Sequence, residues 1–193
     1  MITWTSRLIA LLCALTLLAA CEEGQGGSPF AASTTPRNTA LSQAKMAQGA
    51  VTVVPPEGFC IDKSTLKARF ALMARCDRLG APQATGSAAP VGIITVSLAP
   101  ATADRTLPQP IDSAKALGLE QIADQVTAQT HVTFSAQGGP PVDGMSGRHW
   151  RGTALVGSYL MSLALFGPAE GRAVGAEGRG LLLEVIAATR AAD

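Results

Sequence analysis

Residues 149–166 read HWRGTALVGSYLMSLALF, and this stretch decides the fold. Apolar and β-branched residues fill two runs, His149–Val156 and Ser158–Phe166, which meet at Gly157. The pattern predicts two strands joined by a tight glycine turn. One long strand with a bulge at Gly157 is the alternative. The apolar run in residues 149–166 is too short and too interrupted to span a membrane.

Further strands follow from short apolar or alternating runs that end at proline, glycine or polar clusters. The clearest is Val91–Leu98 (VGIITVSL), apolar enough for a central strand. Leu66–Cys76 is ambiguous, since a helix over this segment and a strand over Arg69–Cys76 both fit, and we favour the strand. The remaining extended segments are Val51–Val54, Gly58–Asp62 and His131–Ala136.

Two helices are expected. Asp112 or Ser113 can cap the first, whose apolar stripe has helical spacing over Leu119, Ile122, Ala123 and Val126. The second is Leu181–Ala192, a good helix by propensity. Strands therefore come in runs between the helices, which predicts an α+β fold with a mainly antiparallel sheet and two helices packed on it.

This order of elements resembles that of small Mog1/PsbP-like α+β modules. The resemblance is an analogy of fold, because no motif in the sequence carries it. It therefore implies nothing about activity.

The composition of the chain limits the classes of function that it can have. The chain has 193 residues, 15 basic and 14 acidic side chains, 47% hydrophobic and 4% aromatic residues. The length is typical of one domain with extras, and the hydrophobic content excludes a fully disordered chain. A net charge of +1 gives no electrostatic footprint for nucleic acid, so no nucleic-acid partner is expected.

The amino terminus has the features of an export signal. Arg7 precedes the apolar run Leu8–Ala20, which fits a signal peptide and is too short for a membrane span. The stretch Leu18-Ala19-Ala20-Cys21 matches a lipobox, so the start of the chain resembles bacterial lipoprotein precursors. An ordinary secreted protein and an uncleaved anchor are the alternatives.

The resemblance implies cleavage before Cys21, diacylglycerol on its thiol and an acyl chain such as palmitate on the new amino group. Several acyl chains turn reversible membrane association into stable anchoring. Glu22 stands where Asp would retain a lipoprotein in the inner membrane, so the outer membrane is favoured. Cleavage would also remove Arg7 and leave equal numbers of basic and acidic side chains.

Three regions follow: a signal peptide at 1–20, the lipidated Cys21 with a flexible linker at 21–48, and an α+β periplasmic domain at 49–193. The linker is rich in Gly, Ser, Thr, Gln and Pro, and such a segment cannot bury enough surface to offset its ordering entropy. A short docked helix near Thr39–Met46 is an alternative for its end.

Cys60 and Cys76 are the two thiols that remain once Cys13 leaves with the signal and Cys21 takes the lipid. In an oxidising periplasm they are expected to form a disulfide. Closing about 15 residues would stabilise the fold by about 3 kcal/mol. Free thiols, a redox pair or a metal site are alternatives, but the spacing is not Cys-x-x-Cys, and zinc would need His131 and His149 as further ligands.

The most polar and aromatic cluster contains Arg148, His149, Trp150 and Arg151. These residues could bind an anion or stack on a ring. Strand alternation favours a plainer interpretation, in which Trp150 faces the core while Arg148 and either His149 or Arg151 face water.

Catalytic patterns are weak. Gly144–Arg148 has arginine where a nucleophile elbow needs its second glycine, which disfavours a hydrolase built on Ser146 and His149. A glycosidase needs two facing carboxylates, and no spacing selects a pair. The candidate carboxylates are Glu57, Asp62, Asp104, Asp143 and Glu170.

Two further segments carry no expected chemistry. The glycines before the last helix lack the phosphate-loop pattern and are interpreted as a flexible connection. They are Gly167, Gly171, Gly175, Gly178 and Gly180. Asp62–Thr65 and Asp104–Thr106 are interpreted as solvated turns.

The sequence therefore predicts a lipid-anchored envelope lipoprotein, facing the periplasm, that binds or scaffolds without catalysis, cofactor or metal. Its expected contacts are the membrane and a further envelope protein. A cell-envelope hydrolase with an unrecognised site and a carrier of a small hydrophobic ligand are the alternative functions.

Overall fold

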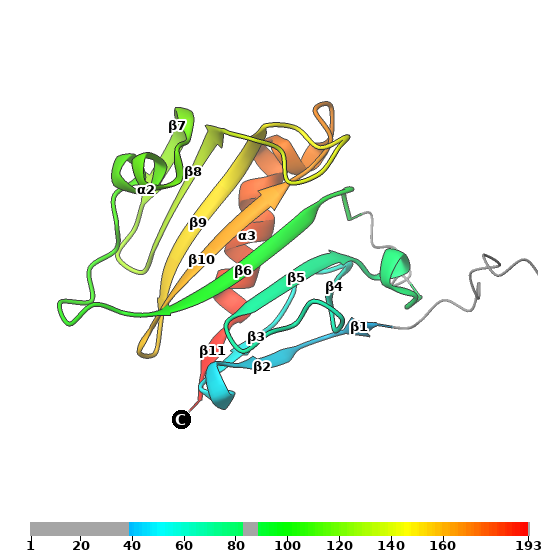
Figure 1. The fold of residues 1–193 in the computed structure, drawn as a ribbon, viewed down its shortest axis with the longest axis horizontal. Coiled ribbons are helices and arrows are strands. Elements are labelled where there is room, and N and C mark those ends of the chain that lie inside the picture. Colours follow the sequence, from blue (N-terminus) through cyan, green and yellow to red (C-terminus); the bar gives the residue numbers. More distant parts are fainter. Residues whose placement is uncertain (1–38, 83–88, 193) are drawn as a thin grey trace, which may run out of the picture. The chain divides into compact units, whose positions relative to one another are not determined.

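The structure is a computed structural model that describes residues 39–82 and 89–192. The predicted signal peptide, the lipobox with Cys21, and the linker up to residue 38 lie outside the described residues. The description below concerns the folded body that follows them (Figure 1).

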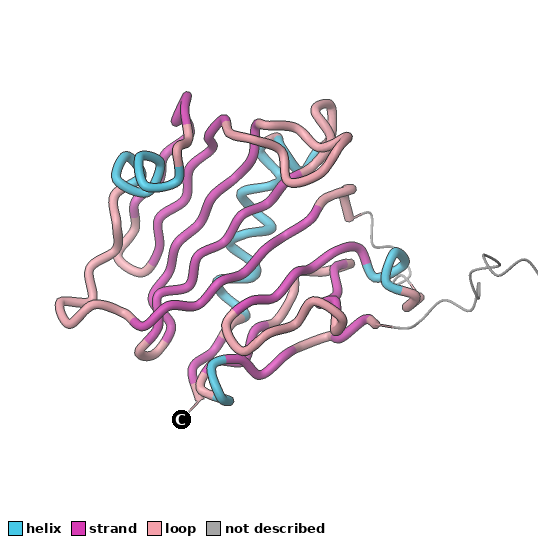
Figure 2. Tube along the Cα trace, viewed as in Figure 1, coloured by secondary structure: helices cyan, strands magenta, loops and turns pink. Residues whose placement is uncertain are grey.

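One large antiparallel sheet organises this body. Within the described residues it has eight strands in the order β1-β4-β5-β6-β10-β9-β8-β7. The strands are β1 (Ala40–Leu41), β4 (Phe59–Asp62), β5 (Phe70–Arg75), β6 (Ile93–Pro100), β7 (Glu120–Thr127), β8 (His131–Gln137), β9 (Arg148–Val156) and β10 (Tyr159–Phe166). Figure 2 shows how much of the chain these strands occupy.

The predicted hairpin at 149–166 is confirmed. β9 and β10 pair from Val156 opposite Tyr159 to Trp150 opposite Leu165. The turn between them contains Gly157, whose φ of +54° is a conformation that glycine adopts without strain. β6 pairs with β10 along its whole length, which confirms Val91–Leu98 as the segment of a central strand.

One face of the sheet is covered by two units (Figure 1). A second, three-stranded sheet contains β2 (Ala44–Met46), β3 (Val51–Val53) and β11 (Arg190–Ala191). Helix α3 (Ala176–Ala188) lies behind β9 and β10 and leads into β11. Both units bury their apolar side chains against the large sheet in one continuous core.

The other helix, α2 (Pro110–Leu117), lies near the β7 edge and packs on β7 and β8 (Figure 1). The fold is therefore α+β, with a mainly antiparallel sheet and two helices, as predicted. Short 3-10 segments complete it at Ala47–Gly49, Cys76–Leu79 and Arg172–Val174.

Helix α3 approaches the sheet closely beside Trp150. The indole Nε1 donates a hydrogen bond to the carbonyl oxygen of Gly175, 2.7 Å away, and the side chain is 3% exposed. A Cβ at Gly178 would lie 2.5 Å from the Trp150 ring and closer still to the Ala173 carbonyl oxygen. The glycine at 178 therefore permits this packing.

The linker prediction is wrong at its end. Residues 40–49 form β1, β2 and a 3-10 turn instead of a flexible tether or a docked helix. Ala44, Met46 and Ala47 are buried in the main core. Burial against the large sheet thus orders a segment whose own composition predicts disorder, and the folded body includes residues that the sequence assigned to the linker.

Both predicted helices have different bounds. The first stops at Leu117, where Gly118 takes a left-handed conformation, and the segment expected as its apolar stripe is the strand β7. The second begins at Ala176, inside the predicted glycine-rich connection, and ends at Ala188. The ambiguous segment before Cys76 is a strand, β5, as favoured.

Cys60 and Cys76 lie at disulfide distance, with their sulfur atoms 1.98 Å apart. They join β4 to the turn that follows β5. Asp62, expected in a solvated turn, is 8% exposed, and its carboxylate accepts hydrogen bonds from the Ser64 hydroxyl and backbone N–H. Among the residues that the structure describes, no helix has the length and apolar character of a membrane span.

Candidate functional site

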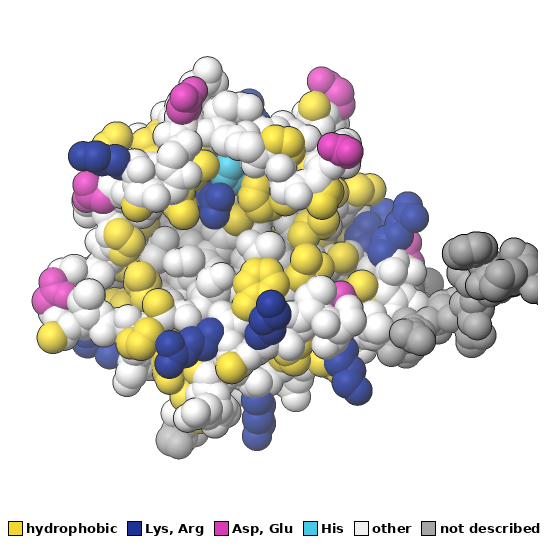
Figure 3. All heavy atoms as spheres, viewed as in Figure 1, with side chains coloured by type: hydrophobic (Ala, Val, Ile, Leu, Met, Phe, Trp, Pro, Cys, Tyr) yellow, Lys and Arg dark blue, Asp and Glu magenta, His cyan; other side chains and the backbone are white. Residues whose placement is uncertain are grey.

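The face of the large sheet opposite α3 carries a polar floor. Paired residues in neighbouring strands share a face, so the register places side chains in rows across it. One row runs from Phe70 through Ser97 and Ser162 to Thr153. Figure 3 views this face and shows it hollowed, with backbone and uncharged polar atoms over much of the floor.

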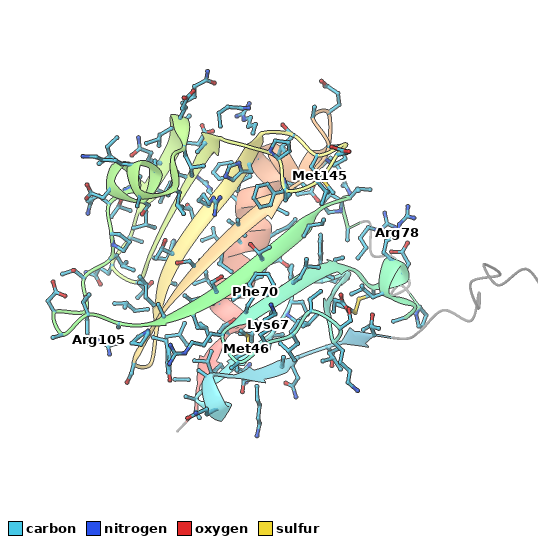
Figure 4. The ribbon with its side chains drawn as sticks, in the orientation of Figure 1. Met46, Lys67, Phe70, Arg78, Arg105 and Met145 are labelled. Carbon is cyan, nitrogen blue, oxygen red and sulfur yellow. A yellow bond between two sulfur atoms is a disulfide. The ribbon has the colours of Figure 1, made fainter. Side chains whose placement is uncertain are left out.

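A second row lies beside the first. It runs from Leu72 through Thr95 and Ala164 to Arg151 and Phe134. Figure 4 shows Phe70 and Lys67 at the β5 side of the same face. The hydroxyl groups thus lie between an aromatic residue on one side and Arg151 on the other.

A cavity of about 420 Å³ opens between α2 and these rows. Ligand cavities of a few hundred cubic ångströms are typical for small molecules. Its walls are the first and last turns of α2 and the inner parts of β8, β9 and β10. The lining residues are Pro108, Asp112, Ser113, Ala116, Leu117, Phe134, Arg151, Gly152, Thr153, Ser162 and Leu163.

A small core separate from the main one holds α2 in place. Ala114 of α2 is buried with Val132, Phe134 and Ala136 of β8. The α2 residue in that core is an alanine, whose small side chain lets the helix lie close to the strand. Ile111 and Leu117 of α2 stay exposed. The helix therefore forms a wall of the cavity without filling it.

His149 lies at the inner end of this face. Its side chain is 1% exposed, and its ring stacks on Phe166 with centroids 4.6 Å apart. Nδ1 lies 2.8 Å from the Gly147 carbonyl oxygen, and Nε2 lies 2.9 Å from Nε of Arg151. An arginine N–H can only donate, so Nε2 accepts and Nδ1 carries the proton that it donates to Gly147.

Burial is the main cause that lowers the pKa of His149 below its ordinary value, and the charge of Arg151 acts in the same direction. The hydrogen bond to Gly147 opposes them. The imidazole is therefore held neutral, in one tautomer, as an acceptor for Arg151.

Arg151 is half-buried and lines the cavity. Its guanidinium carbon lies 5.6 Å from the centroid of the Phe166 ring, in a cation–π arrangement. Within the described part of the chain no carboxylate forms an ion pair with it. Burial lowers its pKa, and no acidic neighbour opposes that effect.

The predicted cluster is divided between two faces. His149 and Arg151 come together on the cavity side, whereas Trp150 points to α3. Arg148 is exposed, and its Nη2 lies 3.6 Å from the Asp124 carboxylate. The interpretation in which His149 faces water is wrong, because Phe166 and the loop at Gly138 cover the ring.

The other candidates stay apart. Ser146 accepts a hydrogen bond from the Arg148 backbone N–H through its hydroxyl oxygen. None of the carboxylates named as glycosidase candidates lines the cavity, whose one acidic residue is Asp112. No group of three or more His, Cys, Asp or Glu side chains suited to a metal ion occurs among residues 39–82 and 89–192.

Sequence reasoning missed Thr153, Ser162 and Phe166. The hairpin itself carried a usable signal, since a two-residue turn after Val156 pairs Ser162 with Thr153 and places Phe166 beside His149. No sequence pattern predicted that α2 lines the cavity, because the predicted bounds of this helix were wrong.

A larger depression of about 630 Å³ lies between the β9–β10 turn and the end of α3. Its walls are mostly apolar side chains and backbone, with Thr130 and His131 at one side. It brings together fewer charged groups than the cavity beneath α2, so the latter is the candidate site.

Comparison with known proteins extends to the fold alone. No family model and no curated protein matches the chain. The chain is similar to the Ran-binding protein Mog1p of Saccharomyces cerevisiae, with a TM-score of 0.49, 14% identity, and coverage of 78% of this chain and 95% of that one. It is similar to cyanobacterial PsbP of Synechocystis, with a TM-score of 0.43, 11% identity, and coverage of 80% and 94%. At these identities the likeness carries no conclusion about function.

Proposed function

We propose that this chain is a lipoprotein of the bacterial cell envelope, anchored through Cys21, whose folded body binds a ligand or partner without catalysis. The binding surface is the face of the large sheet opposite α3. The observation that carries the proposal is the polar floor, which residues 39–82 and 89–192 leave uncovered, with its cavity of about 420 Å³ beneath α2.

A lipid anchor at Cys21 would hold the folded body at a membrane while its open face binds. Cys21 lies eighteen residues before the first described residue, Thr39. The protein would therefore stay in the envelope, preferably at the outer membrane, while its open face meets a partner.

The cysteine pair fits the same compartment. Cys60 and Cys76 are placed at bonding distance, and a structural disulfide persists in an oxidising periplasm but not in a reducing cytosol. The proposal therefore includes oxidation of this pair in the mature protein.

The anchor is tested by Cys21→Ser. Metabolic labelling with palmitate should label the wild-type protein and not the variant, and the variant should accumulate as precursor because its processing depends on the lipidated thiol. Cys60→Ser serves as the matched control and should be labelled and cleaved like the wild type. A Cys21→Ser protein that is still lipidated and cleaved would overturn the anchor.

The binding face is tested by photo-crosslinking in cells. A photoreactive residue is placed at Ser162 or Ser97, exposed on the open face, and at Glu184, exposed on α3, as the control. Adducts identified by mass spectrometry are expected from the first two positions and not from Glu184. Equal adducts from all three positions, or adducts from Glu184 alone, would contradict the proposed face.

A further inference from the structure

We propose that the cavity beneath α2 binds an oxyanion, a carboxylate or a phosphate, carried on a small apolar group, with Arg151 as its cationic contact. This inference rests on the proposed function and deepens it, because it names the class of ligand for the open face. The ligand is a small amphipathic anion.

Arg151 carries a positive charge without an ion-pair partner among the described residues. A half-buried guanidinium has lost part of its hydration, and such a group normally recovers the cost from a carboxylate. No such partner occurs among the described residues, and Arg151 donates a hydrogen bond to the neutral imidazole of His149 instead. A ligand oxyanion would supply the missing negative charge.

The guanidinium of Arg151 is held in one orientation by two contacts. His149 accepts the Nε–H, and the ring of Phe166 lies against the guanidinium. Both contacts fix the plane of the group before a ligand arrives, while no protein acceptor within the described residues holds its terminal nitrogens. The planar arginine fork matches carboxylate and phosphate oxygens with two parallel hydrogen bonds.

The cavity is lined by both polar and apolar side chains. Ser113, Thr153 and Ser162 place hydroxyl groups around the space that Arg151 faces, while Phe134 and Leu117 give it apolar walls. Asp112 lies at the α2 side and is exposed. Its charge disfavours an anion there, so the oxyanion would lie at Arg151 and the apolar group would extend towards α2.

The test is a titration of the full chain, purified in a nonionic detergent, with hexyl phosphate, followed by calorimetry and phosphorus NMR. Arg151→Met keeps the apolar stem and removes the charge. Arg148→Met is the matched control, since Arg148 is on the same strand but exposed and paired with Asp124. The wild type and the control should bind alike, and Arg151→Met should bind at least about ten-fold more weakly.

Hexanol and hexanoate separate the two parts of the ligand. Hexanoate should show the same dependence on Arg151 as hexyl phosphate, and hexanol should bind all variants equally weakly. Equal affinity of hexyl phosphate for the wild type and Arg151→Met would overturn the inference, as would binding that Arg148→Met reduces equally.

Two sources of the phosphate are distinguished with short-chain lipids. Arg151-dependent binding of dihexanoyl phosphatidylglycerol, but not of dihexanoyl phosphatidylcholine, assigns the site to a lipid headgroup. Arg151-dependent binding of hexyl phosphate alone assigns it to a free anion, and both results support the oxyanion site. Crosslinking from Ser162 reports on the binding face separately, so a failed titration with positive crosslinks rejects the ligand class and leaves the proposed face standing.

Discussion

Neighbouring residues of β9 face two very different surroundings. Trp150 points to α3, where it is 3% exposed and bonded to the Gly175 carbonyl oxygen. Arg151 points to the opposite face, where it lines a cavity and has no ion-pair partner among the described residues. One face of the sheet is a close-packed core and the other holds a charged group in a hollow, so changes on the two faces should have different effects.

The largest effect is expected from Leu182→Ala. Leu182 of α3 is fully buried in the main core, so its truncation removes apolar contacts and leaves a cavity. The free energy of unfolding should fall by about 2–5 kcal/mol. Ser162→Ala, on the open face, is the control and should change it by less than about 0.5 kcal/mol. Urea titrations of both variants measure the difference, and equal losses would mean that the two faces contribute equally to stability.

Reduction of the Cys60–Cys76 pair comes next. Loss of this link restores chain entropy to the unfolded state and should lower the free energy of unfolding by about 3 kcal/mol. The measurement is urea unfolding with and without reductant, compared with the Cys60→Ser/Cys76→Ser double variant. Reductant should leave the double variant unchanged. A wild-type protein that is indifferent to reductant would show that the pair is not bonded in solution.

Trp150→Phe should lower the free energy of unfolding by a smaller amount. The variant keeps an aromatic ring against α3 but loses the hydrogen bond to Gly175, which leaves that carbonyl oxygen without its donor. A loss of about 1–3 kcal/mol in the free energy of unfolding is expected. Thermal unfolding of the wild type and the variant checks it, and equal stability of the two would show that this hydrogen bond contributes nothing to the packing of α3.

A smaller effect of pH is expected on the cavity side. The pKa of His149 is lowered from its ordinary value of 6.5, chiefly by burial, so the unfolded chain binds the proton more readily. The stabilising contribution is complete above pH 6.5 and is lost as the pH falls from there through the lowered pKa of the folded state. His149→Phe, which keeps a ring against Phe166, should show a flatter profile over this window.

Asp62 does not obscure that measurement. Burial raises its pKa, but hydrogen bonds from Ser64 and Thr39 outweigh burial, and the net result is a pKa below the ordinary 3.8. Its contribution is present above that value and is lost as the pH falls further. Parallel profiles of stability against pH for the wild type and His149→Phe between pH 5 and 7 would contradict the role given to His149. This window lies on the order of one pH unit or more above the range in which Asp62 takes up a proton.

The sequence predicted most of the sheet because β6, β9 and β10 are long and their apolar pattern is clear. It failed at β7, where Leu119, Ile122, Ala123 and Val126 have helical spacing. The strand pairs with β8 through two register shifts, and Gln121 and Asp124 take left-handed conformations there. Such bulges break the period-two alternation that identifies a strand. Gly118, just after Leu117, was the one local signal that the helix ends early.

Other errors came from tertiary packing. Met46 is buried only because β2 and β3 lie against the large sheet, and no local pattern reports that contact. Gly178 and Gly180 lower helix propensity, yet α3 runs through both, and Gly178 is required by its approach to Trp150. Of the segment Arg148–Arg151, only Arg151 lines the cavity, and alternation alone cannot show that His149 is covered while Arg151 reaches a cavity beneath a helix more than thirty residues away.

One paired measurement tests the central claim, that the face opposite α3 is kept for binding instead of stability. Arg151→Met is assayed for both its free energy of unfolding in urea and its affinity for hexyl phosphate. We expect the affinity to fall at least about ten-fold, while the free energy of unfolding falls by no more than about 1–3 kcal/mol, because the variant leaves the buried Nε2 of His149 without its donor. A variant that is clearly destabilised and binds hexyl phosphate as tightly as the wild type would show that Arg151 is structural and would contradict the account.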